Sequence, residues 1–289
     1  MLPLVSNSST PLFRDHSRHF ANNRFAYPVV SRRSGGISVG VNLNPDKVCN
    51  FDCIYCQVNR VDQSETRFVE QAEMLAELDA MLRLVTSGEL FTDDKFAGTP
   101  PRLRRLNDIA FSGDGEPTTY RNFDEIIEAC AEVKRRHGLG DVKMVLITNA
   151  SMFHRPAVER GLAILDANQG EIWAKLEAGS EAYYRLVERT TIPFERILAN
   201  ITAAARLRPL VIQALFMRIR GDAPSGQEQS AFCDRLNEIV AAGGKLKLVQ
   251  IYTVARPPAE SFVTPLSASE LDALAALVHT RTGLPTAVF

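Results

Sequence analysis

Hydrophobic and polar residues follow two patterns along most of the chain, and these patterns predict strands and helices in turn. Short runs in which branched residues alternate with small or polar ones are typical of strands, as in residues 37–43. Longer stretches with apolar residues at steps of three and four are typical of helices, as in residues 68–85. The predicted strands are residues 37–43, 108–112, 143–148, 172–177, 211–217 and 246–254, and the predicted helices are residues 68–85, 123–136, 156–165, 194–207, 227–242 and 268–282.

Six strand–helix units in alternation predict an α/β fold in which helices cover a parallel sheet. A closed TIM barrel needs eight such units, so we expect an open, partial (β/α)6 TIM-like barrel with its helices outside the sheet. Functional residues are then expected at the carboxyl ends of the strands. Residues 90–105 are predicted to form a loop or a small insertion, and residues 284–289 a short extra strand.

The length favours one large domain, because 289 residues can bury a sizeable core but are few for two full domains. We assign residues 1–36 to an N-terminal arm and residues 37–289 to a core domain with a C-terminal extension. The arm either packs its aromatic rings on the core or contacts an anionic substrate with its arginines. Its arginines are Arg14, Arg18, Arg24, Arg32 and Arg33, interleaved with Phe13, Phe20, Phe25 and Tyr27.

The net charge of −1 gives no basic field over the whole chain, so overall charge does not favour nucleic-acid binding. No apolar run approaches the roughly 18 residues of a membrane-spanning helix. The first ten residues lack the basic and apolar segments of a signal peptide. We therefore expect a cytoplasmic protein that does not associate with a membrane.

Three of the five cysteines lie within eight positions, in the segment CNFDCIYC. An odd number of cysteines in a chain without a secretion signal is not typical of a disulfide framework, so Cys49, Cys53 and Cys56 are predicted metal ligands. A [4Fe–4S] cluster normally takes four thiolates, and three would leave one iron open to another ligand. Cys130 and Cys233 lie in predicted helices and are expected to be buried as small hydrophobic residues.

The cysteines alone leave two non-catalytic alternatives open. One is a structural zinc site with three cysteines and a histidine, although none of the five histidines lies near this loop. The other is a redox-sensing iron–sulfur module in which the three-cysteine cluster binds no further ligand.

The spacing CxxxCxxC with Tyr55 directly before the third cysteine resembles the motif of the radical S-adenosylmethionine (SAM) superfamily. The segment SGDGEPT, residues 112–118, resembles the GGEP motif of that superfamily, with Asp114 in place of its first glycine. Over about residues 37–260, the segments NLNPDKVCNFDCIYCQV, KLEAG and VQIYTVARPPAE together resemble a subgroup of Fe–S oxidoreductases related to the tRNA wybutosine-synthesising radical SAM enzymes. The sequence lacks the second cluster motif of the two-cluster wybutosine enzymes.

The resemblance implies a partial (β/α)6 barrel and an enzyme with one [4Fe–4S] cluster. Cys49, Cys53 and Cys56 would hold three irons, and the amino and carboxylate groups of SAM would chelate the fourth. Reductive cleavage of SAM then gives methionine and a 5′-deoxyadenosyl radical that abstracts hydrogen from a substrate. A ferredoxin or flavodoxin type protein is the expected electron donor.

Residues at the strand ends are the expected SAM contacts. Bare backbone at Gly113 and Gly115 would allow close approach, and Glu116 could accept a hydrogen bond from the SAM ammonium. Simpler roles stay open, since Asn149 could cap the next element and Lys175 could pair with Glu177. By resemblance, the SAM-binding residues are Tyr55, Gly113, Asp114, Gly115, Glu116, Asn149, Lys175, Glu177 and Ile251.

The substrate is not determined by these motifs. Modification of an RNA or nucleotide is slightly favoured by the arginine and aromatic residues of the arm, ahead of chemistry on a small metabolite and of glycyl-radical activation of a partner protein. Gln213 and Gln250 are polar residues within apolar strands that either satisfy backbone or water or reach a ligand, and Arg218 or Arg256 could bind a substrate carboxylate or phosphate.

Overall fold

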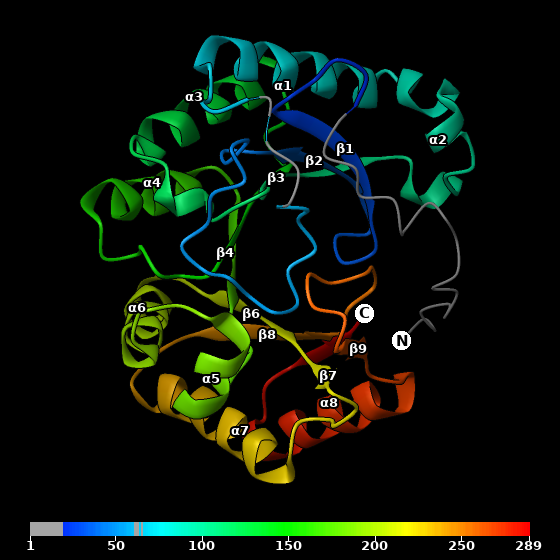
Figure 1. Cartoon of the computed structure of the whole chain (residues 1–289). Helices are drawn as coiled ribbons and strands as arrows, with labels where there is room; N and C mark the ends of the chain where they lie inside the picture. The colour runs from blue at the N-terminus through cyan, green and yellow to red at the C-terminus, as the bar shows by residue number, and fades with distance from the viewer. Residues whose placement is uncertain (1–19, 61–63, 65) are drawn as a thin grey trace.

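The computed structural model describes residues 20–60, 64 and 66–289. Within these residues, one sheet has the strand order β1-β2-β3-β4-β5-β6-β8-β10 (Figure 1). Its central neighbours from β2 to β8 are parallel, as predicted. The strands of this sheet are β1 (Ala26–Ser31), β2 (Gly36–Val41), β3 (Leu106–Phe111), β4 (Lys143–Thr148), β5 (Gly170–Lys175), β6 (Leu210–Leu215), β8 (Leu246–Tyr252) and β10 (Thr286–Val288).

The helices lie outside the curved sheet, with α1, α3 and α4 along one part of it and α6, α7 and α8 along the other (Figure 1). This arrangement confirms the predicted partial (β/α)6 barrel. The α-helices are α1 (Gln71–Thr86), α2 (Asp94–Ala97), α3 (Phe123–Arg136), α4 (Pro156–Ala167), α5 (Glu181–Glu188), α6 (Phe194–Leu207), α7 (Gly226–Ala241) and α8 (Ala268–Thr282). Short 3₁₀ helices are η2 (Glu89–Thr92), η3 (Pro101–Leu103) and η4 (Pro117–Thr119), and β7 (Met217–Ile219) pairs with β9 (Val263–Pro265) in a separate small sheet.

Several elements differ from the prediction. β5 ends at Lys175, two residues before the predicted end, and the short helix α5 follows it, which the periodicity did not reveal. The predicted loop at residues 90–105 contains η2, α2 and η3. The predicted extra strand near the C-terminus is confirmed, because β10 pairs in parallel with β8.

Strand β1 lies in the segment that the sequence assigned to an arm, and it pairs antiparallel with β2 at the edge of the sheet. Glu77 of α1 fixes the start of β1 by accepting hydrogen bonds from the backbone N–H groups of Arg24, Phe25 and Ala26. The β1–β2 turn then carries Arg33 into the interior of the partial barrel. Arg14, Arg18 and Phe13 lie outside the described residues.

Most buried apolar side chains form one core between the sheet and its helices. Cys130 and Cys233 belong to this core, as predicted, and burial raises the pKa of the Cys130 thiol to about 12. A smaller apolar cluster fills the inside of the sheet, formed by Ala110, Val145, Trp173 and Val211. Among the described residues, no helix has both the length and the apolar composition that crossing a membrane requires.

Candidate active site

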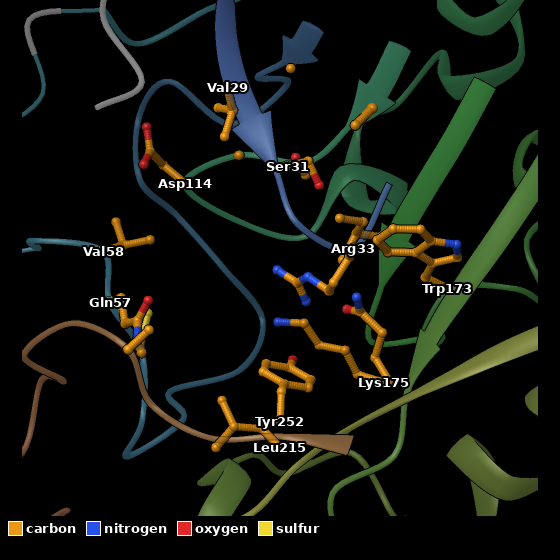
Figure 2. Close-up of a pocket in the computed structure, with 18 of the residues that line it drawn as sticks. Val29, Ser31, Arg33, Gln57, Val58, Asp114, Trp173, Lys175, Leu215 and Tyr252 are labelled. Atoms are coloured by element: carbon orange, nitrogen blue, oxygen red, sulfur yellow. The ribbon is translucent and has the colours of Figure 1, made fainter. Parts of the chain in front are cut away.

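A cavity of about 300 Å³ lies inside the curved sheet and reaches the loop that follows β2. Its volume is at the lower end of the range of about 300–1,000 Å³ that small-molecule sites occupy. Figure 2 shows residues from β1, β5, β8 and the loops after β2 and β3 around it. The cavity lining includes Cys49, Cys53, Cys56, Tyr55, Gly113, Asp114, Gly115, Glu116, Asn149 and Lys175.

The cysteine loop is held by its apolar residues and by backbone hydrogen bonds to α5. Phe51, Ile54 and Tyr55 are buried. The N–H of Asp52 donates to the Glu188 carbonyl at 3.1 Å, and the N–H of Ile54 donates to the Val187 carbonyl at 2.9 Å. These anchors leave the three thiols half-buried at the cavity, and none of the cysteines forms a disulfide.

The surroundings of the thiols include a carboxylate and a guanidinium. The Cys53 thiol donates to Glu188 Oε2 at 2.8 Å, and burial together with this carboxylate raises the pKa of Cys53 well above its usual value. Burial also raises the pKa of Cys49. Arg60 donates from Nη1 to the Phe51 carbonyl at 3.1 Å, while its buried Nε has no hydrogen-bond partner among the described residues.

The positive charge of Arg60 is favoured by the thiols. Burial opposes this charge, but Cys56 and Cys49 raise the pKa of the guanidinium above its usual value. The sequence analysis missed Arg60, since an arginine four residues after Cys56 in a polar segment carries no distinguishing pattern.

The donor set fits a [4Fe–4S] cluster. Three thiols from one short loop line one cavity. The Cys49 and Cys56 thiols favour the positive charge of Arg60, whose Nε–H is unpaired among the described residues. In a cluster of this kind each thiolate binds its own iron. Among the described residues, no group of three His, Cys, Asp or Glu side chains is placed so that it could hold one metal ion.

Glu116, in the loop after β3, ties this loop to the loop after β4. Its Oε1 accepts hydrogen bonds from Thr118 N at 3.1 Å, from the Thr118 hydroxyl and from the Thr148 hydroxyl at 2.6 Å. Its Oε2 accepts from Asn149 N at 2.7 Å. Glu116 therefore borders the cavity while its carboxylate is largely occupied by protein donors.

The two glycines before Glu116 lie where other segments approach closely. A Cβ on Gly113 would overlap the Asn42 side chain, and a Cβ on Gly115 would overlap the Val48 carbonyl of the cysteine loop. Asp114 accepts a hydrogen bond from Asn42 Nδ2 at 2.7 Å. The bare backbone of this segment thus lets the cysteine loop pack on the end of β3.

Asn149 lies at the end of β4 and borders the cavity. Its Nδ2 donates to Asn50 Oδ1 at 2.9 Å, which links it to the cysteine loop, and its Oδ1 accepts from Ser151 N at 3.0 Å. Asn149 does not cap the next helix, since α4 begins at Pro156 and Arg155 is its N-cap residue.

Lys175 lines the cavity, whereas Glu177 is buried behind it and is not among the lining residues. Burial opposes the charge of Lys175, but Tyr252 and Glu177 raise its pKa above the usual range. Burial and the neighbouring Glu188 carboxylate raise the pKa of Glu177 well above its usual value. Ile251 is fully buried and also lies outside the lining.

The remaining polar candidates have the following positions. Gln213 donates from Nε2 to Gln250 Oε1 at 2.9 Å, so the two buried amides satisfy each other in part. Arg218 pairs with Glu270 at 2.5 Å and is not part of the cavity lining, whereas Arg256 is.

Residues 43–220, more than half of the chain, match the sequence profile described as the Radical SAM superfamily. The chain belongs to the radical SAM superfamily. This confirms the resemblance seen in the cysteine motif, and it makes the protein an enzyme of a class that uses a [4Fe–4S] cluster, SAM and a reductant.

Similar proteins extend the comparison of this radical SAM enzyme. A UPF0026 protein of Helicobacter pylori (strain J99) is 26% identical over 84% of this chain and 70% of its own length. A protein named GTPase Obg from Brachyspira hyodysenteriae is 26% identical over 62% of this chain, which spans only 23% of that protein. The structure described as TYW1 with a lysine-pyruvate adduct bound has 16% sequence identity and a TM-score of 0.48, covering 86% of this chain and 74% of that chain.

Strand β1 and the β1–β2 turn, which no motif indicated, also contribute residues to the cavity of this radical SAM enzyme. Arg33, in the β1–β2 turn, lies over the rings of Tyr252 and Trp173, with its Cζ 4.9 and 5.9 Å from their centroids. In the sequence, only the excess of arginines in residues 1–36 suggested that this segment could contact a ligand.

Proposed function

We propose that Cys49, Cys53 and Cys56 hold one [4Fe–4S] cluster and that SAM binds beside it in the same cavity, where it is cleaved reductively. The observation that carries this proposal is that three free thiols border one cavity with the Gly113–Glu116 segment and the end of β4. When bound, the reduced cluster and SAM supply methionine and a 5′-deoxyadenosyl radical that abstracts hydrogen from the substrate.

The residues around the thiols prepare the site in distinct ways. Arg60 supplies a half-buried cation beside the thiols, which favours their deprotonated form. Glu116 and Asn149 hold the ends of β3 and β4 against the cysteine loop. The backbone of Gly113, Asp114 and Gly115 then stays open toward the SAM amino group.

Further SAM contacts are assigned on the same basis. The ammonium of Lys175 is suited to the SAM carboxylate, because it borders the cavity and carries its charge at neutral pH. Tyr55 borders the cavity next to the third cysteine and is suited to the adenine. The remaining proposed SAM-binding residues are Asn149, which lines the cavity, and Glu177 and Ile251, which lie behind the lining.

The electron donor is proposed to be a ferredoxin or flavodoxin type protein. For the substrate, modification of an RNA or nucleotide remains the favoured class, ahead of a small metabolite and of glycyl-radical activation. What supports an anionic substrate is that Arg32 and Arg33 both border the cavity, whereas Arg24 pairs with Glu73 on the outside.

Anaerobic reconstitution with iron and sulfide tests this function. We expect iron-dependent absorbance, and 5′-deoxyadenosine when dithionite and SAM are added. Cys53→Ala should abolish both the product and the intact cluster. Cys233→Ala is the matched control, because it removes a cysteine of the core far from the cavity lining and should leave both unchanged.

Two outcomes would contradict the proposal. A brown cluster that never cleaves SAM would favour a redox-sensing module. Zinc in anaerobically purified protein, without iron-dependent absorbance, would favour a structural metal site.

A further inference from the structure

The β1–β2 turn, residues 31–36, brings a cation into the cavity from the side away from the cysteines. Figure 2 shows Arg33, Lys175 and Trp173 on one side of the cavity and Gln57 and Val58, which follow Cys56 in the sequence, on the other. Arg33 is half-buried there, and its guanidinium is held against aromatic rings by cation–π contacts. The turn thus fixes the direction of a charged side chain toward the substrate side of the cavity.

Arg33 and Lys175 extend toward the same space (Figure 2). Arg33 lies over the ring of Tyr252, whereas the Lys175 ammonium lies 5.8 Å from the centroid of the Tyr55 ring in the cysteine loop. Two positive charges in one cavity repel each other, and low local dielectric strengthens that repulsion. An anion bound beside Arg33 relieves this repulsion.

The negative groups near this pair are already engaged or lie behind it. Glu177 and Glu188 favour the charge of Lys175 from behind the lining, and Asp108, at the start of β3, accepts a hydrogen bond from Ser38. Among the described residues, no ion pair joins Arg33 or Lys175 to a carboxylate. Within the described part of the chain, Arg33 therefore has no carboxylate as an ion-pair partner.

The geometry points to a substrate subsite in which Arg33 binds a carboxylate or phosphate group, while Lys175 serves the SAM carboxylate. The planar guanidinium can donate two parallel hydrogen bonds to either anion, which fixes orientation as well as charge. Its place across the cavity from the cysteine loop suits the substrate rather than the cofactor. This inference rests on the proposed function, because it names the class of molecule that the radical would meet.

Binding of simple anions tests the subsite. The reconstituted protein is titrated anaerobically with inorganic phosphate and, separately, with acetate, at constant ionic strength and with saturating SAM. Trp173 is the only tryptophan in the sequence and lies next to Arg33, so its fluorescence reports occupancy, with calorimetry as a second measurement. The stronger of the two anions distinguishes a phosphate ester substrate from a carboxylate substrate.

Arg33→Gln should weaken anion binding by about tenfold or more, because it removes a charge-assisted, bidentate contact. Arg33→Lys, which keeps the charge without the planar fork, should weaken it less and serves if the first variant does not fold. Arg220→Gln is the matched control, because Arg220 also lies over an aromatic ring, that of Phe262, but outside the cavity lining, and it should bind as the parent does.

Three results would overturn the inference: neither anion binds to the parent protein, the Arg33 variants bind as the parent does, or saturating SAM abolishes anion binding, which would assign the subsite to the cofactor. Failure of the proposed function is a separate result, since a protein that never cleaves SAM can still be titrated with phosphate in the same way.

Discussion

Replacing Glu116 by glutamine exchanges one carboxylate oxygen for an amide group that only donates hydrogen bonds. If the amide nitrogen occupies the Oε2 position, it faces the N–H of Asn149, which in the parent protein donates to Glu116 at 2.7 Å. If it occupies the Oε1 position, it faces the N–H of Thr118, which in the parent protein donates to Glu116 at 3.1 Å. Hydroxyl groups can rotate, but these backbone N–H groups cannot.

Either orientation of the new amide therefore leaves one buried backbone donor unpaired, at a cost of about 1–3 kcal/mol. For a chain of this size, that free energy corresponds to a fall in melting temperature of about 2–10 °C. We expect this loss in the protein without cofactors, measured by thermal denaturation followed by circular dichroism. Glu125→Gln is the control, because Glu125 is exposed and accepts one hydrogen bond from Asn122.

A melting temperature unchanged by Glu116→Gln would refute the reasoning that Glu116 ties the two strand ends together. SAM affinity of the reconstituted variant separates the two possible roles of this carboxylate. A loss of affinity without a loss of stability would mean that Glu116 binds the SAM ammonium directly and is not needed to hold the loops.

Three further substitutions test other parts of the site and the fold. Gly115→Ala sets a Cβ against the Val48 carbonyl, so we expect a stability loss of about 1–3 kcal/mol and lower iron content after reconstitution, whereas Gly140→Ala, with open space around its Cβ, should change neither. Arg60→Gln removes the cation beside the thiols and should make the cluster reduction potential more negative in an EPR-monitored titration. Glu171→Gln should lower stability at neutral pH by about 1 kcal/mol, and thermal melts across pH should show this difference vanish in acid.

The pH dependence of the Glu171 variant follows from the direction of its pKa shift. Burial opposes the charge, but hydrogen bonds from Lys247, Trp173 and Lys143 hold the pKa of Glu171 below its usual value. A carboxyl whose pKa is lower in the folded state stabilises the fold above the unfolded pKa, and this contribution is lost as the pH falls through the folded value. A difference between parent and variant that persists below both values would contradict this account.

The other two predictions have equally direct contradictions. Normal iron loading in Gly115→Ala would show that the cysteine loop can shift without losing its ligand geometry. An unchanged potential in Arg60→Gln would mean that its guanidinium does not act on the cluster, and Arg160→Gln, which removes a pair with Asp124 outside the cavity lining, controls for general charge effects.

Local patterns in the sequence predicted most of the fold and the position of the cysteine loop. Alternation of strands and helices is a local property, and each of the six predicted parallel strands is present. The short helix α5 was missed because eight residues give too few turns for a clear period. Its absence from the prediction also hid Glu188, which contacts Cys53 only through the tertiary fold.

The glycines of the SGDGEPT segment have a packing role in the structure that the sequence did not suggest. The sequence predicted bare backbone so that a ligand could approach closely. In the structure, Gly113 and Gly115 also admit Asn42 and Val48 from the preceding loop. Close packing by the protein and close approach of a ligand both require glycine at these positions. The local motif therefore does not distinguish protein packing from ligand binding.

The two sides of the cavity come from different parts of the chain. The cysteine loop and the residues after β3 lie within residues 43–220, which match the superfamily, whereas Arg33 and Tyr252 lie outside that range. These two residues are more than 200 positions apart in the sequence, and only the curvature of the sheet brings the β1–β2 turn to the end of β8. The shared segment therefore carries the chemistry of the superfamily, while the turn and β8 shape the surface that selects the substrate. Replacing Arg33 should accordingly change the affinity for substrate anions more than the affinity for SAM.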